Sequence, residues 1–139
     1  MEFDLMGITY RCGKIDARKQ FHIVRRLAPV LSELAPAVGK PSAGADVLTP
    51  LANALAKLSD ADSDYVVFGL LDCVRRKQPD GLGWAQVNTG ITLMFEDITL
   101  PVMLQLAAKA FMYNLSGFFA ALPSDLQGAI QKQSGQSAG

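Results

Sequence analysis

The chain has 139 residues, of which 50% are hydrophobic, and its 13 basic residues balance its 13 acidic residues to a formal net charge of zero. This length and apolar content suffice for one domain that buries its own core without stabilising disulfides or metals. The neutral charge excludes the strongly basic character of proteins whose main partner is the phosphate backbone of a nucleic acid.

The cysteines and the N-terminus indicate the compartment. Cys12 and Cys73 have no Cys or His nearby at metal-ligand spacing, so we expect two buried free thiols instead of a disulfide or a zinc site. The N-terminus carries Glu2 and Asp4 and lacks a basic stretch followed by an apolar run, unlike a secretory signal. We therefore expect a cytoplasmic protein.

The first elements are a hairpin and a helix. Residues 2–12 alternate between apolar and polar side chains, which predicts a short β-hairpin that turns at Met6-Gly7. Asp16 is suited to be the N-cap of a helix. Pro29 predicts a kink or break in this helix, because its ring clashes with the carbonyl group four residues earlier. The apolar side chains that repeat at helical spacing are Phe21, Val24, Ala28, Leu31 and Ala35.

A loop and a short helix follow. Residues 36–50 contain three prolines and two glycines, and this composition predicts a mobile loop. Residues 49–58 predict a short helix, with Thr49 as its cap. Pro50 falls in the first turn, where its missing N–H group costs nothing.

A third helix is predicted from about Ser63 to Lys77. Acidic residues precede it and basic residues end it, and charges placed in this way complement the helix dipole. Residues 65–71 contain good strand formers, so a strand remains the open alternative there. The charged residues are Asp60, Asp62, Asp64, Arg75, Arg76 and Lys77.

The next segment is irregular and leads to a long helix. Residues 81–90 are predicted to form a loop that carries Trp84, and residues 91–95 a short strand or an extended connection. Thr99, followed by a proline at position 101, is predicted to begin the last helix. This helix is expected to break near Ser116-Gly117 and to end before residue 123.

The last helix and the tail complete the expected fold. Residues 100–122 are long and apolar enough to resemble a membrane span, but Lys109 at the centre favours a helix with one polar side and no membrane. Residues 127–139 are rich in Gln, Ser and Gly and predict a flexible tail. The expected fold class is α+β and mainly α-helical. It has an N-terminal β-hairpin followed by about four to five helices in one compact domain over residues 1–126.

Sites for chemistry are scarce. His22 is the only histidine and stands between Arg18 and Arg26 at four-residue spacing, so a solvated histidine is favoured over a catalytic base. The sequence contains no nucleotide-binding glycine motif, and the acidic run Asp60–Asp64 lacks the glycine and the glutamate of a calcium-binding loop. We expect no enzyme activity, no cofactor and no metal, and a protein that works by binding other proteins.

Charge and apolar residues are unevenly distributed. Residues 11–40 concentrate basic side chains, which fits a solvated face and a docking face equally well. The last helix carries more large apolar groups than one face needs, so some of them could serve a partner or a second copy of the chain in a homo-oligomer. These groups are Phe111, Met112, Tyr113, Phe118 and Phe119.

Five segments carry a resemblance to a known family: residues 14–27 (KIDARKQFHIVRRL), 74–78 (VRRKQ), Trp84, 93–98 (LMFEDI) and 114–119 (NLSGFF). In order and spacing they resemble the phage tail assembly chaperones. The resemblance implies a protein of a tailed phage or prophage that acts in the bacterial cytoplasm. Such proteins coat the helical tape measure protein, keep it soluble and are displaced by polymerising tail tube protein, so they are absent from the mature virion. It also implies that a longer, frameshifted form can exist.

If the resemblance holds, the client helix needs a groove with a charged rim and apolar anchors. The candidate rim is Arg18, His22, Arg25 and Arg26, and the candidate anchors are Trp84, Phe118 and Phe119. Two alternatives stay open. A prophage could use such a protein to block tail assembly by a superinfecting phage, or the basic helix could belong to a small regulator that binds nucleic acid.

Overall fold

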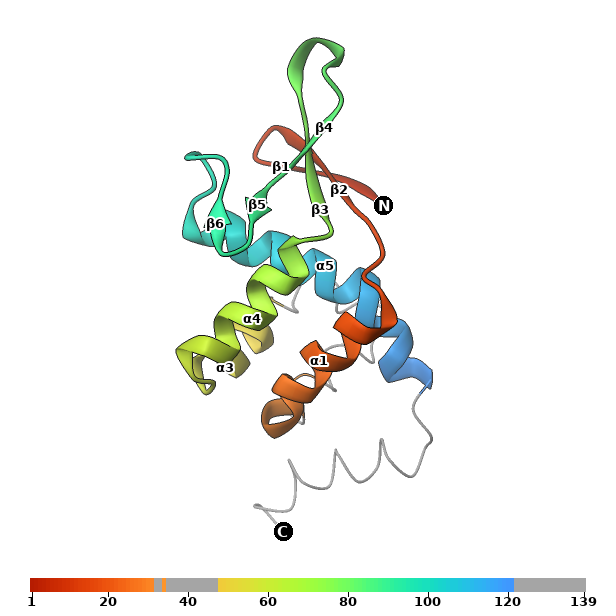
Figure 1. The fold of residues 1–139 in the computed structure, drawn as a ribbon, viewed down its shortest axis with the longest axis vertical. Coiled ribbons are helices and arrows are strands. Elements are labelled where there is room, and N and C mark those ends of the chain that lie inside the picture. The colour runs from red at the N-terminus through yellow and green to blue at the C-terminus, as the bar shows by residue number, and fades with distance from the viewer. Residues whose placement is uncertain (32–33, 35–47, 122–139) are drawn as a thin grey trace.

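The computed structural model of the chain describes residues 1–31, 34 and 48–121, and of residues 117–121 it describes the backbone alone. Most of the loop predicted over residues 36–50 and all of the tail predicted over residues 127–139 lie outside this part. Within it, four α-helices gather at one end of the molecule, and an antiparallel sheet stands at the other end (Figure 1).

The N-terminal hairpin is confirmed. Strand β1 (Glu2–Leu5) pairs antiparallel with strand β2 (Ile8–Cys12). The turn lies at Met6 and Gly7, whose φ angles are 54° and 81°. Positive φ at both central residues is what the usual two-residue hairpin turn requires, because its twist then matches that of the strands.

The sheet does not stop at this hairpin. Strand β3 (Val74–Lys77) pairs antiparallel with β2, and strand β4 (Trp84–Gln86) pairs antiparallel with β3, giving the order β1-β2-β3-β4. A second, two-stranded sheet joins β5 (Asn88–Thr89) to β6 (Thr92–Leu93). The predicted fold class is therefore wrong. The described residues hold four α-helices and two antiparallel sheets, not a lone hairpin followed by four to five helices.

The error arose where the third helix ends. Helix α4 (Asp60–Leu71) begins earlier than predicted. Its N-cap is Ser59, whose Oγ accepts a hydrogen bond from the N–H group of Asp62 at 3.1 Å. It excludes the alternative strand over residues 65–71, but it ends well before Lys77. Pairing the next residues with the open edge of β2 satisfies backbone N–H and C=O groups that would otherwise lack partners. The basic residues 75–77 thus lie in β3 and do not cap a helix.

The helix that starts at Asp16 is confirmed. In α1 (Ala17–Leu27), the Asp16 side chain accepts a hydrogen bond from the N–H group of Lys19 at 2.9 Å, which is the N-cap that its sequence predicts. The helix ends at Leu27 and continues as a 3₁₀ turn, η1 (Ala28–Val30), that contains Pro29. The predicted break at this proline is confirmed.

The buried face of α1 differs from the predicted one. Phe21 is exposed, and each side chain that enters the core lies one position before a member of the predicted series. They are Ile23, Leu27, Val30 and Leu34, each at most 5% exposed. Two apolar series compete on this helix, and packing against α4 selects the second.

The short helix and the last helix are each partly as expected. Helix α3 (Leu48–Ala56) includes Thr49 and Pro50 in its first turn, so Thr49 is not its cap. Helix α5 (Leu100–Ala121) begins after Thr99 but runs through Ser116-Gly117, and the break predicted there is wrong. One glycine costs a helix only about 1 kcal/mol. Among the described helices, none combines the length and the apolar character needed to cross a membrane.

The connection between α4 and α5 is also more regular than expected. Trp84 lies in strand β4 and not in a loop, whereas the strand allowed for residues 91–95 is confirmed by β6. A 3₁₀ turn, η3 (Pro79–Gly81), precedes β4.

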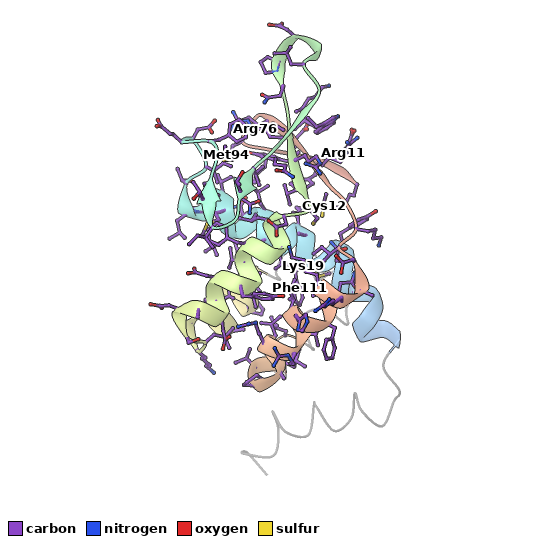
Figure 2. All side chains as sticks on the ribbon, viewed as in Figure 1. Arg11, Cys12, Lys19, Arg76, Met94 and Phe111 are labelled. Atoms are coloured by element: carbon purple, nitrogen blue, oxygen red, sulfur yellow. The ribbon has the colours of Figure 1, made fainter. Side chains whose placement is uncertain are left out.

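The core lies between the helices and continues under the sheet. Helix α4 packs against both α1 and α5, and Phe111 of α5 is fully buried at the level of the helices (Figure 2). Gly69 allows α1 to approach α4 closely, because a Cβ atom there would lie 3.3 Å from Cδ1 of Ile23. Above them, Tyr10 and Cys12 extend the core to the inner side of β2.

Candidate protein-binding surfaces

Helix α1 turns one side to the core and the opposite side to solvent. Ile23 and Leu27 have no exposed surface, whereas Arg18, Phe21 and Arg25 are exposed. At about 100° per residue, positions 18, 21 and 25 share the side of the helix opposite the two buried residues. Phe21 keeps 61% of its surface in solvent, so this helix presents an aromatic ring between two arginines.

His22 adds to the same surface. Its ring centroid lies 5.3 Å from that of Phe21, with the two rings tilted by 59°, and His22 is half-buried. The four residues Arg18, Phe21, His22 and Arg25 are called the α1 outer face below. The sequence predicted three of them as a charged rim, but it placed Phe21 in the apolar series of the helix.

Arg26, the fourth predicted rim residue, has a different environment. Its Nη1 lies 2.5 Å from Oδ1 of Asp62, and its guanidinium lies 4.1 Å from the ring centroid of Tyr65. Both partners are on α4, so Arg26 joins α1 to α4. Asp62 is 36 residues away in the chain, and only the fold brings it to Arg26.

The predicted anchors do not gather at the α1 outer face. Trp84 lies in β4, at the end of the molecule opposite α1 (Figure 1), and the guanidinium of Arg11 covers its ring at 4.6 Å from the centroid. Phe118 and Phe119 belong to the last turns of α5, where the side chains fall outside the described part of the structure. Their role as anchors stays a prediction.

Further large apolar side chains are exposed in the connections of the two sheets. Met6 in the β1–β2 turn, Leu82 between β3 and β4, and Ile91 between β5 and β6 are each at least 69% exposed. They lie on separate turns, so none of them is flanked by charged neighbours on one helix as Phe21 is.

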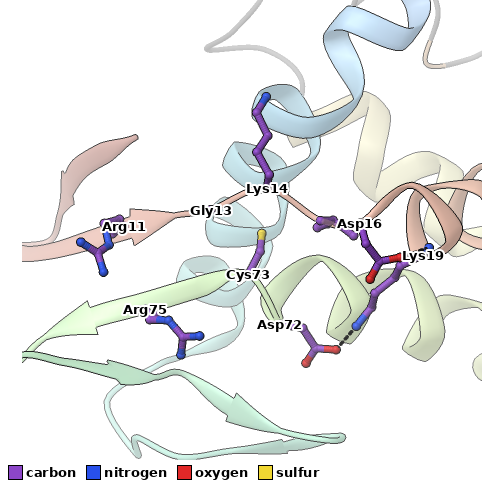
Figure 3. Close-up of a pocket in the computed structure, with 9 residues that line it drawn as sticks. Arg11, Gly13, Lys14, Asp16, Lys19, Asp72, Cys73 and Arg75 are labelled. Atoms are coloured by element: carbon purple, nitrogen blue, oxygen red, sulfur yellow. Dashed lines mark hydrogen bonds and ion pairs between the residues drawn. The ribbon is translucent and has the colours of Figure 1, made fainter.

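A pocket of about 320 Å³ lies where β2 leads into α1, beside the connection from α4 to β3 (Figure 3). Arg11 of β2 and Arg75 of β3 stand directly opposite each other at its sheet end. At its helical end Lys19 forms an ion pair with Asp72. The pocket is lined by Arg11, Gly13, Lys14, Ile15, Asp16, Lys19, Asp72, Cys73 and Arg75.

Two thiols adjoin this pocket. The Sγ atoms of Cys12 and Cys73 lie 3.5 Å apart, and neither residue is in a disulfide. The prediction of free thiols is confirmed, and that of burial is confirmed for Cys12, whereas Cys73 is half-buried. Their separation of 61 residues in sequence left no local signal that they would meet.

Asn114 of α5 holds the backbone beside these thiols. Its Oδ1 accepts a hydrogen bond from the N–H group of Ile15 at 2.8 Å, and its Nδ2 donates to the carbonyl oxygen of Gly13 at 3.1 Å. Nδ2 also lies 3.6 Å from Sγ of Cys73 and 3.9 Å from Sγ of Cys12. In the described residues, no three His, Cys, Asp or Glu side chains are placed to hold a metal ion.

Comparison with known proteins gives a match over most of the chain. A family model described as "Phage tail assembly chaperone protein, TAC" matches residues 6–128. No curated protein and no solved structure matches the chain. The matched range extends from the turn of the N-terminal hairpin beyond the last described residue of α5.

Proposed function

Because the chain belongs to the phage tail assembly chaperone family, we propose that it binds the tape measure protein and keeps that protein soluble while the tail is built. It does so in the host cytoplasm, is displaced as tail tube protein polymerises, and is absent from the finished virion. The observation that carries this proposal is the α1 outer face, where the exposed ring of Phe21 lies between Arg18 and Arg25.

This surface suits an amphipathic helix. A client helix with an apolar stripe needs an apolar contact on the chaperone, and the acidic side chains that flank such a stripe find cations at the rim. Full burial of a phenylalanine side chain contributes about 1.5–3 kcal/mol. With 61% of Phe21 exposed, its contact with a client is worth about 1–2 kcal/mol by the same measure.

The arginines act mainly on recognition. Arg18 and Arg25 are exposed, and solvent-exposed ion pairs contribute at most about 1 kcal/mol each. They favour acidic over basic client helices and speed association at low salt. Arg26 contributes indirectly, because its contact with α4 holds the helix in place.

The test is co-expression with the tape measure protein of the same phage, scored by the fraction of that protein that stays soluble. We expect the wild-type chain to keep it soluble and Phe21→Asp to fail. Leu82→Asp is the matched control, because it makes the same kind of change at a side chain that is 76% exposed on the other end of the molecule. Equal solubility with wild type and Phe21→Asp would refute the α1 outer face as the binding surface.

A second assay distinguishes a chaperone that assists tail assembly of its own phage from a protein that blocks tail assembly of another phage. Expression of the chain alone in a sensitive host is expected to leave infection by other phages unchanged. Resistance would instead show that the chain blocks tail assembly by a superinfecting phage. Retention on DNA at low salt, which we do not expect of a neutral chain, would favour a nucleic-acid regulator.

A further inference from the structure

The pocket beside the two thiols has an unusual charge arrangement. Arg11 and Arg75 are directly opposite on neighbouring antiparallel strands, and like charges in that position destabilise a sheet. Arg11 stacks on Trp84, but its positive charge is retained. The other cations of the pocket are engaged, since Lys19 pairs with Asp72, and Lys14 reaches the carbonyl oxygen of Tyr113 at 3.4 Å. The sheet end of the pocket therefore attracts an anion.

Cys73 lies at this pocket and Cys12 lies behind it. Figure 3 shows Cys73 between the two arginines on one side and the Lys19–Asp72 pair on the other. Cys73 lines the pocket and is half-buried, whereas Cys12 is 1% exposed. A reagent in the pocket thus reaches the sulfur of Cys73 first.

From this geometry we propose that Cys73 and Cys12 form a reactive dithiol that accepts a small anionic disulfide, such as glutathione disulfide, in the basic pocket and closes into a Cys12–Cys73 bond. The two sulfur atoms are 3.5 Å apart and need to approach to about 2.0 Å. The hydrogen bond from the N–H group of Gly13 to the carbonyl oxygen of Cys73, at 2.8 Å, already holds the two backbones together.

The environment of the thiols assigns the order of reaction. The hydrogen bond shared by the two thiols lowers the pKa of Cys73 against the effect of burial, and the Asn114 amide lowers it further. The same hydrogen bond to Cys73, together with burial, raises the pKa of Cys12. The thiolate is the attacking species in thiol–disulfide exchange, so Cys73 attacks and Cys12 resolves.

The exchange balances without any further reagent. The Cys73 thiolate attacks one sulfur of the small disulfide, its S–S bond breaks, and one thiolate leaves. Cys12 then loses its proton, and its sulfur attacks the sulfur of Cys73 and expels the second thiolate. The two leaving groups take up the two protons that the cysteines held. The protein dithiol is oxidised by two electrons, and the small disulfide is reduced to two thiols.

A bond of this kind is transient in a reducing cytoplasm, where disulfides that form serve catalysis or redox sensing. Once closed, it would tie β2 to the connection between α4 and β3. Figure 2 shows Cys12 where the sheet meets the helices, so the bond would join these two parts of the molecule.

The test follows the mass of the reduced, full-length chain after exposure to glutathione disulfide. We expect wild type to lose two hydrogen atoms and to regain them with a reductant. Cys12→Ser should stop at an adduct of one glutathione on Cys73, and Cys73→Ser should react at least about tenfold more slowly, because the remaining thiol is buried. Cys12→Ala is a second variant if a buried serine unfolds the chain, as judged by circular dichroism.

A second arm tests the pocket. Cystamine is a small disulfide with positive charges, and we expect wild type to react faster with glutathione disulfide than with cystamine. Arg75→Gln should reduce this preference severalfold, whereas Lys77→Gln, which removes a charge from the same strand outside the pocket lining, should preserve it. The proposal is overturned if wild type stays reduced, if Cys73→Ser reacts as fast as wild type, or if Arg75→Gln keeps the full preference.

Discussion

Replacing Asn114 by alanine tests how the chain joins the sheet to the helices. The Asn114 side chain is 93% buried, since its relative exposure is 7%, and it bonds the backbone of both Ile15 and Gly13. Without it, the N–H group of Ile15 stays buried without that acceptor, which costs about 1–3 kcal/mol. The lost donor to Gly13 adds about 1 kcal/mol. We expect Asn114→Ala to lower the free energy of unfolding by about 2–4 kcal/mol.

Urea denaturation followed by circular dichroism measures this change, with the slope of the transition compared between variants. Gln105→Ala is the control, because Gln105 lies on the same helix, is half-exposed, and its side chain makes no hydrogen bond with the described residues. Its expected change is within about 0.5 kcal/mol. A loss below about 0.5 kcal/mol for Asn114→Ala would refute the reasoning. It would mean that water or a shifted backbone replaces the amide at no cost.

Three further predictions concern the core and the sheet. Phe111→Ala should lower the free energy of unfolding by about 3–5 kcal/mol, since the ring is fully buried; urea denaturation measures it. Gly69→Val should cost about 1–3 kcal/mol in the same assay, because its side chain meets Ile23. Arg76 forms a two-point ion pair with Asp97, at 2.5 and 2.9 Å, which lowers the pKa of Asp97. The contribution of this ion pair to stability is present above the ordinary carboxyl pKa of about 3.9. It is lost as the pH falls through the lower pKa that Asp97 has in the folded state. Thermal denaturation should therefore show wild type more stable than Asp97→Asn at pH about 6, and the difference should vanish in acid.

Local chemistry made part of the fold predictable. The hairpin turn at Met6-Gly7, the N-cap at Asp16 and the break at Pro29 each depend on a few neighbouring residues, and all three are confirmed. Strand β3 was not predictable in this way, because residues 74–77 become a strand only when the edge of β2 is beside them. Their basic side chains read equally well as the end of a helix.

The candidate site was predictable in its charges but not in its apolar part. Arg18 and Arg25 lie on α1 as its sequence indicates, but two apolar series at helical spacing compete on that helix. One contains Phe21 and the other contains Ile23 and Leu27. Only the approach of α4, made possible by Gly69, decides that Ile23 enters the core and Phe21 faces solvent. Phe21 is a large aromatic residue that the core does not accommodate, and its presence between two arginines is the signal of a binding surface that the sequence analysis missed.

The α1 outer face and the thiol pocket can be tested separately, because α1 turns different sides toward them. Lys19 lines the pocket, whereas Phe21 lies two residues further, about 200° around the helix. Cys12 leads into α1 through residues 13–16, and Asn114 of α5 holds the backbone of Gly13 and Ile15 in this connection. Phe21→Asp should therefore leave the rate of Cys12–Cys73 bond formation unchanged, and Cys12→Ser should leave the tape measure protein soluble. If Cys12→Ser also abolishes solubilisation while circular dichroism shows an intact fold, the two surfaces are coupled and do not act independently.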